Sequence, residues 1–391
     1  MTEPTDLVYL DYAASTPVDA WVVEAMTALM TADGNYANPS SSHSAGRRSV
    51  EHIAHAAGQL AGLLNTQADR LIWTSGATES DNLAILGAAR YRQNRGRHLL
   101  SMRTEHKAVT DPCKELERQG YDVTWLNPQA SGLLDVATFE AALRDDTQLV
   151  SIMHVNNETG VTQDIAQLGA ICRARDILFH VDAAQSVGKL PIDLSILPVD
   201  LMSMTAHKVY GPKGIGALYI ADRPGVHVDA LLFGGGQQRG LRPGTLPAQQ
   251  IVGFGVAAAI AQSRMSNDLQ HLSAMRERLW NGIRDIPGVT ANGALECAFP
   301  GILNVSAEDI EGESLLLALE PLCVATGSAC NSKNQEPSHV LRALGKSDAL
   351  AQSAIRFSFG RPTCANDINL AIARYRSAIE KLRNMAPGQA A

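Results

Sequence analysis

The sequence predicts an α/β protein, in which a large domain with a mainly parallel sheet precedes a smaller α+β domain. Between about residues 45 and 260, short apolar runs alternate with amphipathic stretches. Strands joined by helices that cover both faces of a sheet give this pattern. After about residue 262, longer helical patterns take over. The chain of 391 residues suffices for more than one domain, and we expect a large domain at 16–262 and a small domain formed by 1–15 and 263–391.

The expected elements of the large domain follow one another closely. Strands are expected at 71–74, 98–102, 148–155, 177–182, 200–205 and 216–220. Helices are expected at 48–64, 79–91, 108–119 and 164–174. In the C-terminal part, helices are expected at 267–286, 311–319 and 366–384, with an apolar run at 300–306.

Composition and charge exclude several classes of protein. The net charge is −7 and the pI about 5.9, without the basic stripe of a nucleic-acid-binding protein. No secretory signal is recognisable, and the clearest apolar stretch, 251–261, is too short to span a bilayer. The six cysteines include no C-x-x-C pair, so neither a disulfide framework nor a zinc site is expected. We expect a cytoplasmic protein that binds neither membranes nor nucleic acid directly.

Polar residues follow five of the expected strands. They are 75–78 (Ser-Gly-Ala-Thr), 104–106 (Thr-Glu-His), 156–158 (Asn-Asn-Glu), Asp182 and 206–208 (Ala-His-Lys). In open α/β sheets, ligands bind beyond the carboxyl ends of the strands. One such segment would mean little, but five at the same edge predict an active site.

Three of these features together meet the needs of one cofactor. Residues 75–78 are small and precede a helix, so their backbone N–H groups can face an anion. Asp182 ends an apolar strand, where a carboxylate needs a cationic partner. Lys208 ends the next strand, where a partly apolar cleft would make its amine a nucleophile for aldehydes. Pyridoxal phosphate requires an anion site, an acid for its ring nitrogen and a Schiff-base lysine.

Each feature also has a plainer interpretation. Residues 75–78 can form an ordinary helix N-cap, Asp182 a structural ion pair, and Lys208 a solvated surface group, although their combination weakens this view. His106 suits proton transfer near neutral pH or stacking on a ring, but it can equally be structural. Arg356 lies between apolar residues and could bind a carboxylate in bidentate fashion or form a structural ion pair.

One cysteine differs from the rest. Cys330 lies among small and polar residues at 327–334 (Gly-Ser-Ala-Cys-Asn-Ser-Lys-Asn). This composition predicts a mobile, exposed loop at about 323–337, in which a thiol is reachable and reactive. Cys323, between two aliphatic residues, is expected in the core, and the remaining cysteines are by default buried apolar residues.

Several longer motifs carry a family resemblance. They are 74–80 (Thr-Ser-Gly-Ala-Thr-Glu-Ser), 104–107 (Thr-Glu-His-Lys), 156–160 (Asn-Asn-Glu-Thr-Gly), 181–186 (Val-Asp-Ala-Ala-Gln-Ser), 206–208 (Ala-His-Lys) and 327–330 (Gly-Ser-Ala-Cys). From Tyr9 to about Leu382 the chain resembles the group I cysteine desulfurases of the NifS/IscS type, most closely the IscS branch. The resemblance implies the pyridoxal phosphate-dependent transferase fold type I, aspartate aminotransferase-like and related to class V aminotransferases, with a seven-stranded sheet.

The resemblance also implies roles for individual residues. Lys208 would hold pyridoxal 5'-phosphate as a Schiff base, Asp182 would pair with the ring nitrogen, and His106 would stack on the ring as a catalytic residue. The remaining implied contacts are Gln185 to the ring oxygen, Ala77, Thr78, Thr205 and His207 to the phosphate, Thr245 to the phosphate of the other subunit, Asn157 to the cofactor, and Asn157 with Arg356 to the substrate carboxylate. Shared sites of this kind require a homodimer.

The implied reaction transfers sulfur from L-cysteine to Cys330, leaving a persulfide on Cys330 and releasing L-alanine. An acceptor protein would then take the sulfur for iron-sulfur cluster assembly, tRNA thiolation or DNA phosphorothioation. Two alternatives stay open: another pyridoxal phosphate enzyme, such as an aminotransferase or a selenocysteine lyase, and a non-catalytic scaffold that kept the fold. The filled catalytic positions argue against the scaffold.

The chain departs from the family pattern at three places. Thr205 and Ala206 stand where the family has Ser-Gly, and 237–239 (Gln-Gln-Arg) stand where it has His-Glu-Arg. The sequence stops at Ala391, short of the longer IscS tail that contacts the iron-sulfur scaffold protein. The hydroxyl of Thr205 preserves the expected phosphate contact, whereas the short tail leaves the acceptor protein open.

Overall fold

The structure, a computed structural model, describes residues 7–326 and 336–385. Its largest sheet has seven strands in the order β2-β8-β7-β6-β5-β3-β4. They are β2 (Leu71–Thr74), β3 (His98–Met102), β4 (Asp122–Leu126), β5 (Thr147–Ser151), β6 (Leu178–Asp182), β7 (Leu201–Thr205) and β8 (Gly216–Ile220). β8 is antiparallel to both of its neighbours, while β3 to β7 pair in parallel, so β2 points the same way as they do. The predicted mainly parallel sheet of seven strands is confirmed.

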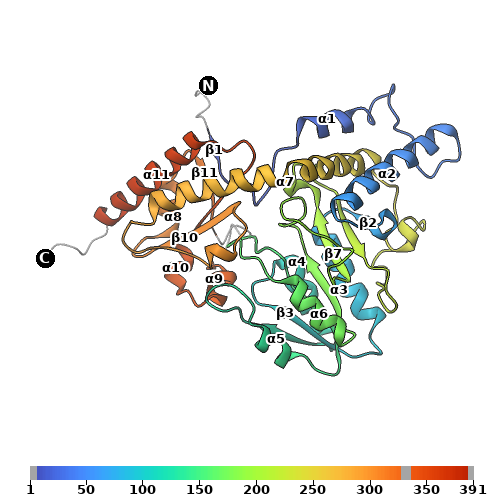
Figure 1. Ribbon diagram of the computed structural model, residues 1–391, viewed down its shortest axis with the longest axis horizontal. Coiled ribbons are helices and arrows are strands. Elements are labelled where there is room, and N and C mark those ends of the chain that lie inside the picture. Colours follow the sequence, from blue (N-terminus) through green and yellow to red (C-terminus); the bar gives the residue numbers. More distant parts are fainter. Residues whose placement is uncertain (1–6, 327–335, 386–391) are drawn as a thin grey trace.

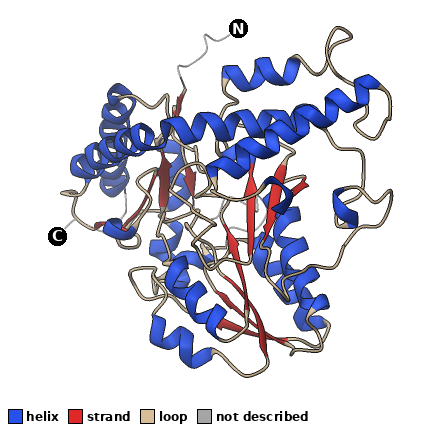
Figure 2. Ribbon diagram, turned by 45° about the vertical axis from the view of Figure 1, so that its right-hand side comes forward, coloured by secondary structure: helices blue, strands red, loops and turns tan. Residues whose placement is uncertain are grey.

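Helices cover both faces of this sheet (Figure 1, Figure 2). One layer contains α2 (Ser44–Leu63), α6 (Ile165–Ala174) and the first half of α7 (Ala248–Ile283), and the other contains α3 (Ala77–Tyr91) and α4 (Lys107–Arg118). In β3, Leu100 packs in the first layer and Leu99 in the second. This alternation is expected of a strand that is buried on both faces. The short helices α1 (Ala20–Thr27) and α5 (Val136–Ala142) pack outside the first layer.

A second, smaller core forms around an antiparallel sheet in the order β12-β13-β10-β9. Its strands are β9 (Val289–Ala291), β10 (Ile302–Ala307), β12 (Ala325–Thr326) and β13 (Ile355–Ser358), and β1 (Val8–Tyr9) pairs with β11 (Leu322–Cys323) beside it. The helices are α8 (Gly312–Ala318), α9 (His339–Ala343), α10 (Asp348–Gln352) and α11 (Ala365–Met385). Leu10, Phe357 and Tyr375 are fully buried there.

Helix α7 differs most from its sequence prediction. A helix was expected at 267–286, apart from the apolar stretch 251–261, yet one helix of 36 residues, Ala248–Ile283, contains that stretch and most of the expected helix. No glycine or proline occurs between residues 256 and 281, so nothing in the backbone ends the helix where its packing changes. In Figure 1 this helix runs along the top of the molecule, from the large sheet to the small one. The predicted division of the chain at residue 262 stays a prediction.

Strand β4 was absent from the expected strands. It lies at the end of the sheet, and its five residues range from exposed to buried, so it gives no continuous apolar run. In the described ranges, no helix is long and apolar enough to cross a membrane.

Candidate active site

A cavity of about 1310 Å³ lies at the carboxyl ends of the parallel strands. All five strand-end segments that the sequence singled out contribute to its lining. These contributions are Ser75 to Thr78 after β2, His106 after β3, Asn157 and Glu158 after β5, Asp182 at the end of β6, and His207 and Lys208 after β7. The small sheet adds Arg356 from β13. The site is therefore built from both cores.

One end of the cavity can hold an anion. Helix α3 begins after Gly76, whose N-cap position provides no side-chain hydrogen bond. A Cβ placed on Gly76 would lie 3.8 Å from the Thr205 hydroxyl oxygen, so the first N–H groups of the helix and a threonine hydroxyl share one opening. Ala77 and Thr78 form the first turn. Such a helix N-terminus favours a phosphate group, because the dipole and the backbone donors act together.

Three carboxyl groups form what we call the acidic floor: Asp81, Glu105 and Asp182. Asp81 and Glu105 are fully buried, and Asp182 is nearly so. The Asp81 carboxyl faces Ser203 and His180. Burial and the charge of Asp182 raise the pKa of Asp81 well above its ordinary value, and burial likewise raises the pKa of Glu105. In both of these acids, burial therefore favours the protonated form.

A buried polar row continues from the floor across the sheet. His180 Nε2 lies 3.6 Å from an Asp81 carboxyl oxygen and 2.9 Å from the Ser203 hydroxyl, and His180 Nδ1 lies 2.8 Å from the Ser151 hydroxyl. Burial lowers the pKa of His180 to about 3, so its ring is neutral. Ser151, His180 and Ser203 each stand two positions after a leucine on their strand, and side chains two positions apart point to the same face of a sheet. Those leucines pack in the same layer, so the three polar residues share one face. Sequence reasoning missed them, although that period-two spacing was visible.

Three bases also belong to this region, and we call Lys189, His207 and Lys208 the basic wall. His207 and Lys208 line the cavity, and Lys189 lines a small cavity that shares Lys208 with it. A short turn, Ala206–Lys208, places His207 and Lys208 after β7. His207 Nδ1 lies 3.3 Å from the Ser15 hydroxyl. Burial, reinforced by the neighbouring lysines, lowers the pKa of His207 to about 4. A histidine in this state is neutral and can accept or donate one hydrogen bond at each side of its ring.

His106 stands at the start of α4. Its Nδ1 accepts a hydrogen bond of 3.1 Å from the Ala108 N–H, so the proton of the neutral ring is on Nε2. Burial lowers the pKa of His106 and outweighs the opposing charge of Asp182. An uncharged ring that lines the cavity is suited to stacking on a flat cofactor.

Gln185 is buried, and its amide is engaged at both ends. Nε2 donates to the Ala13 carbonyl oxygen at 2.8 Å, and Oε1 accepts from Lys189 Nζ at 2.8 Å. The amide nitrogen keeps a second hydrogen, and Gln185 lines the cavity. This residue can therefore still donate a hydrogen bond to a ligand.

Arg356 combines both of its sequence interpretations. It donates one hydrogen bond of 2.7 Å to the Asn157 carbonyl oxygen and another of 2.7 Å to the Asp11 carboxylate. The second contact is an ion pair. In the described part of the chain its Nε is buried without a partner. Because a guanidinium has five N–H donors, two contacts leave donors for a carboxylate ligand. Beside it, burial raises the pKa of Glu158 to about 7 despite a 2.5 Å hydrogen bond from Ser338.

Several predicted residues lie away from this cavity or cannot be placed. Thr245 is exposed and does not line it, and Gln237 holds the preceding turn by accepting a 2.8 Å hydrogen bond from the Gly244 N–H. Cys330 and most of the predicted 323–337 loop lie outside the described residues. The expectation for the other cysteines was partly wrong: Cys113 and Cys172 are buried, Cys297 and Cys323 are half-buried, and Cys364 is exposed. Cys323 lies on a short two-stranded ladder that packs at the edge of the small core.

These groups fit pyridoxal phosphate. The uncapped start of α3 suits its phosphate, Asp182 suits its ring nitrogen, and Lys208 suits its aldehyde. The Arg356 Nε, buried without a partner in the described part of the chain, fits a polar occupant of the cavity. The fold and the site thus define the class of pyridoxal phosphate-dependent enzymes of fold type I.

Within this class the chain belongs to the aminotransferase class-V family, whose model matches residues 8–370. A cysteine desulfurase IscS of Cronobacter sakazakii is 55% identical over 381 residues, covering 97% of this chain and 94% of that relative. A solved NifS-like protein has a TM-score of 0.89 at 34% identity, covering 96% of this chain and 100% of that one. The structure of SspA in complex with cysteine has a TM-score of 0.79 at 39% identity, covering 90% and 98%. The predicted family, fold type and cofactor are confirmed.

Proposed function

We propose that this enzyme is a cysteine desulfurase that removes sulfur from L-cysteine, stores it as a persulfide on Cys330 and passes it to an acceptor protein. The observation that carries the proposal is one cavity in which a phosphate site, a buried Asp182, Lys208 and the arginine of β13 converge. The relatives named IscS carry the desulfurase activity in their name, at high identity along nearly the whole chain. This likeness favours a desulfurase over the aminotransferase and selenocysteine lyase alternatives.

The chain's own residues have distinct tasks in this reaction. The bound cofactor supplies an electron sink that weakens the carbon–sulfur bond of the substrate. Arg356 and Asn157 hold the substrate carboxylate, and Asp182 keeps the ring nitrogen protonated. The Cys330 thiolate forms a sulfur–sulfur bond as the carbon–sulfur bond breaks, and the electron pair of that bond stays with the carbon fragment. Protonation of that fragment gives L-alanine.

Further residues hold the cofactor in place. Ala77, Thr78, Thr205 and His207 bind the phosphate, Gln185 donates to the ring oxygen, and Asn157 adds a contact to the cofactor. His106 stacks on the ring, and its Nε2–H can take part in proton transfer while Nδ1 stays bonded to Ala108. Lys208 binds the cofactor covalently. The neutral rings of His106 and His207 support these contacts, because each can bind without introducing a second positive charge beside Lys208.

A homodimer completes the proposal. Thr245 is exposed and outside its own cavity, which suits a role at the phosphate of the other subunit. Large apolar side chains are also exposed, among them Trp21, Met30, Tyr36, Leu232 and Phe233. A second copy that covers them would remove this apolar surface from water. Within the cytoplasm, where thiols stay reduced, the enzyme would supply sulfur for iron-sulfur cluster assembly or for thio-modification of tRNA or DNA.

The decisive experiment replaces the persulfide-forming thiol. We expect Cys330→Ser to keep the bound cofactor, seen as unchanged visible absorbance, and to lose sulfide release from L-cysteine with a reductant present. Mass spectrometry of the wild type after incubation with L-cysteine should show one added sulfur on the Cys330 peptide. The half-buried Cys323 provides the matched control, because Cys323→Ser should leave both measurements unchanged. Normal turnover by Cys330→Ser would overturn the persulfide mechanism.

A further inference from the structure

Lys189 is a second amine beside the active site, and no motif or spacing in the sequence singles it out. It lies in the turns between β6 and β7 and lines a small cavity of about 40 Å³. Ala13 and Lys208 line both this cavity and the large one. Lys189 Nζ lies 5.6 Å from the centre of the Phe299 ring. A lysine side chain is ordinarily flexible and well hydrated. Here it is held in a partly apolar recess next to the cofactor site.

The contacts of Lys189 fix the orientation of Gln185. The ammonium group is a donor, so the Gln185 atom that faces it at 2.8 Å must be the amide oxygen. The Ala13 carbonyl is an acceptor, so the atom that faces it at 2.8 Å must be the amide nitrogen. The two neighbours agree on one orientation. The second amide hydrogen of Gln185 is therefore left for the large cavity.

Lys189 is also electrostatically uncompensated. Over the described ranges, no carboxylate lies within 4.0 Å of its Nζ. Asp268 on the rim of the small cavity pairs with Arg361 at 2.7 Å instead. The other titratable or charged groups that line this cavity are Tyr12, Lys208, Tyr210, His271 and Arg361. Burial, with the charges of Lys208 and Arg356, lowers the pKa of Lys189 to about 7.

We propose that Lys189 is a positioning residue of the active site, which holds the Gln185 amide so that it donates to the ring oxygen of the cofactor and which opposes positive charge on Lys208. The proposal rests on the proposed contact between Gln185 and that oxygen. A hydrogen bond to the ring oxygen stabilises its anionic form, and a nearby ammonium disfavours a further proton at the Lys208 nitrogen. Both effects lower the proton affinity of the group that joins Lys208 to the cofactor.

The test measures the visible absorbance of the bound cofactor as a function of pH. Lys189→Met keeps the length and the apolar contacts of the side chain but removes the donor and the charge. We expect the pH midpoint of the absorbance change to rise by about one unit, and kcat/KM for L-cysteine to fall by about tenfold. Lys189→Arg, which keeps charge and donors, should return the midpoint toward that of the wild type.

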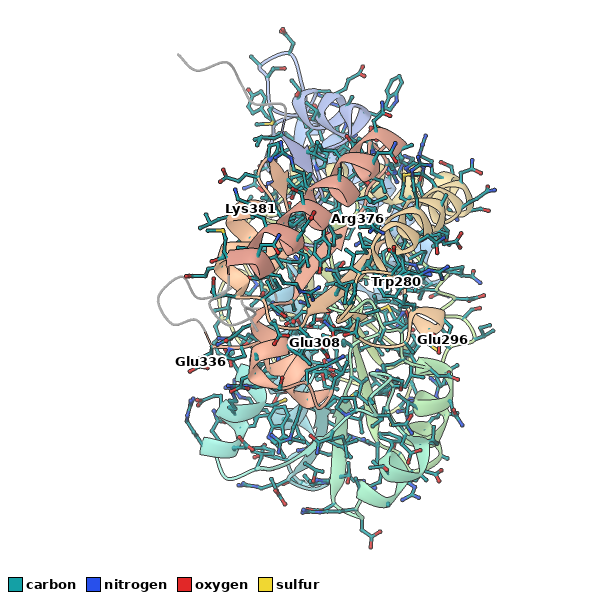
Figure 3. The ribbon with its side chains drawn as sticks, turned by 90° about the vertical axis from the view of Figure 1, so that its left-hand side faces the viewer. Trp280, Glu296, Glu308, Glu336, Arg376 and Lys381 are labelled. Atoms are coloured by element: carbon teal, nitrogen blue, oxygen red, sulfur yellow. The ribbon has the colours of Figure 1, made fainter. Side chains whose placement is uncertain are left out.

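Two further variants separate the possible causes. Lys381→Met removes a lysine on α11 (Figure 3) that lines neither cavity, and should leave the midpoint unchanged. Gln185→Leu should raise the midpoint as Lys189→Met does. If Gln185→Leu raises it and Lys189→Met, folded and loaded with cofactor, does not, then the role of Lys189 is refuted and the proposed function stands. If Gln185→Leu also has no effect, the contact of Gln185 with the ring oxygen fails, and this proposal fails with it.

Discussion

The acidic floor and the basic wall both lie at the active site, and burial shifts pKa values in opposite directions in the two regions. On the floor, burial raises the pKa values of Asp81 and Glu105. On the wall, it lowers those of His207, to about 4, and of Lys189, to about 7. For these four groups burial favours the neutral form, because surroundings with little water solvate charge poorly. The difference teaches that burial disfavours the charged form of acids and bases alike beside the cavity that the cofactor and the substrate would occupy.

The largest expected effect is on kcat, when the carboxylate of Asp182 in the acidic floor is replaced. Asp182→Asn keeps the shape of the side chain but removes the carboxylate that is proposed to pair with the ring nitrogen. We expect kcat to fall by about 10²–10³-fold, the usual loss of one preorganised electrostatic group, with cofactor content measured in parallel. Glu105→Gln is the matched control: burial favours the protonated form of Glu105, so its isosteric amide should change kcat by no more than about threefold. Equal losses in the two variants would mean that the floor carries more than one charge.

A smaller effect is expected on KM at Arg356. It separates the proposed role of Arg356 in binding the substrate from its structural ion pair with Asp11. Arg356→Lys keeps the charge but loses the fork of N–H groups, so KM for L-cysteine should rise about ten- to a hundredfold. Asp11→Asn weakens the ion pair with Arg356 and leaves the guanidinium in place. It should lower thermal stability slightly and change KM by no more than about threefold. Should Asp11→Asn raise KM as much as Arg356→Lys, the ion pair itself would be what the substrate site needs.

The smallest expected effect is on the pH dependence of stability. It tests whether burial also raises the pKa of Glu158, an acid outside the acidic floor. The pKa of Glu158 is raised from 4.5 to about 7, so the folded protein holds this proton more tightly than the unfolded chain does. Its contribution to stability is full below about pH 4.5 and is lost as pH rises through about 7. Glu158→Gln stays neutral and should flatten this part of the pH dependence.

The measurement for Glu158 is urea unfolding of the holoenzyme at pH 5 and at pH 8. The change in unfolding free energy between the two pH values should differ between variant and wild type by up to about 3 kcal/mol. The exposed Glu308 (Figure 3) supplies the control, and Glu308→Gln should follow the wild type. The same pH dependence in wild type and Glu158→Gln would show that Glu158 is already ionised at pH 5.

Local sequence was informative where a strand ends in polar residues. The segments before α3, before α4 and after β7 carry small, hydroxyl or basic residues directly after an apolar run, and all three line the cavity. It was uninformative for Asp81 and Lys189, which lie inside a helix and a turn. No spacing rule marks a helical aspartate as buried against a second carboxyl, because that depends on which sheet face the helix covers.

Sequence by itself determined the alternating strands and helices, the polar strand ends, the family and the cofactor. These depend on hydrophobic period and on motifs that the chain carries locally. Only the tertiary structure decided which polar groups are charged and which way they point. It buried Asp81 beside Asp182, set Lys189 against Gln185 and tied Arg356 to Asp11. The reason is physical: desolvation and hydrogen-bond partners come from residues far apart in the chain, and they exist only once the two cores have packed.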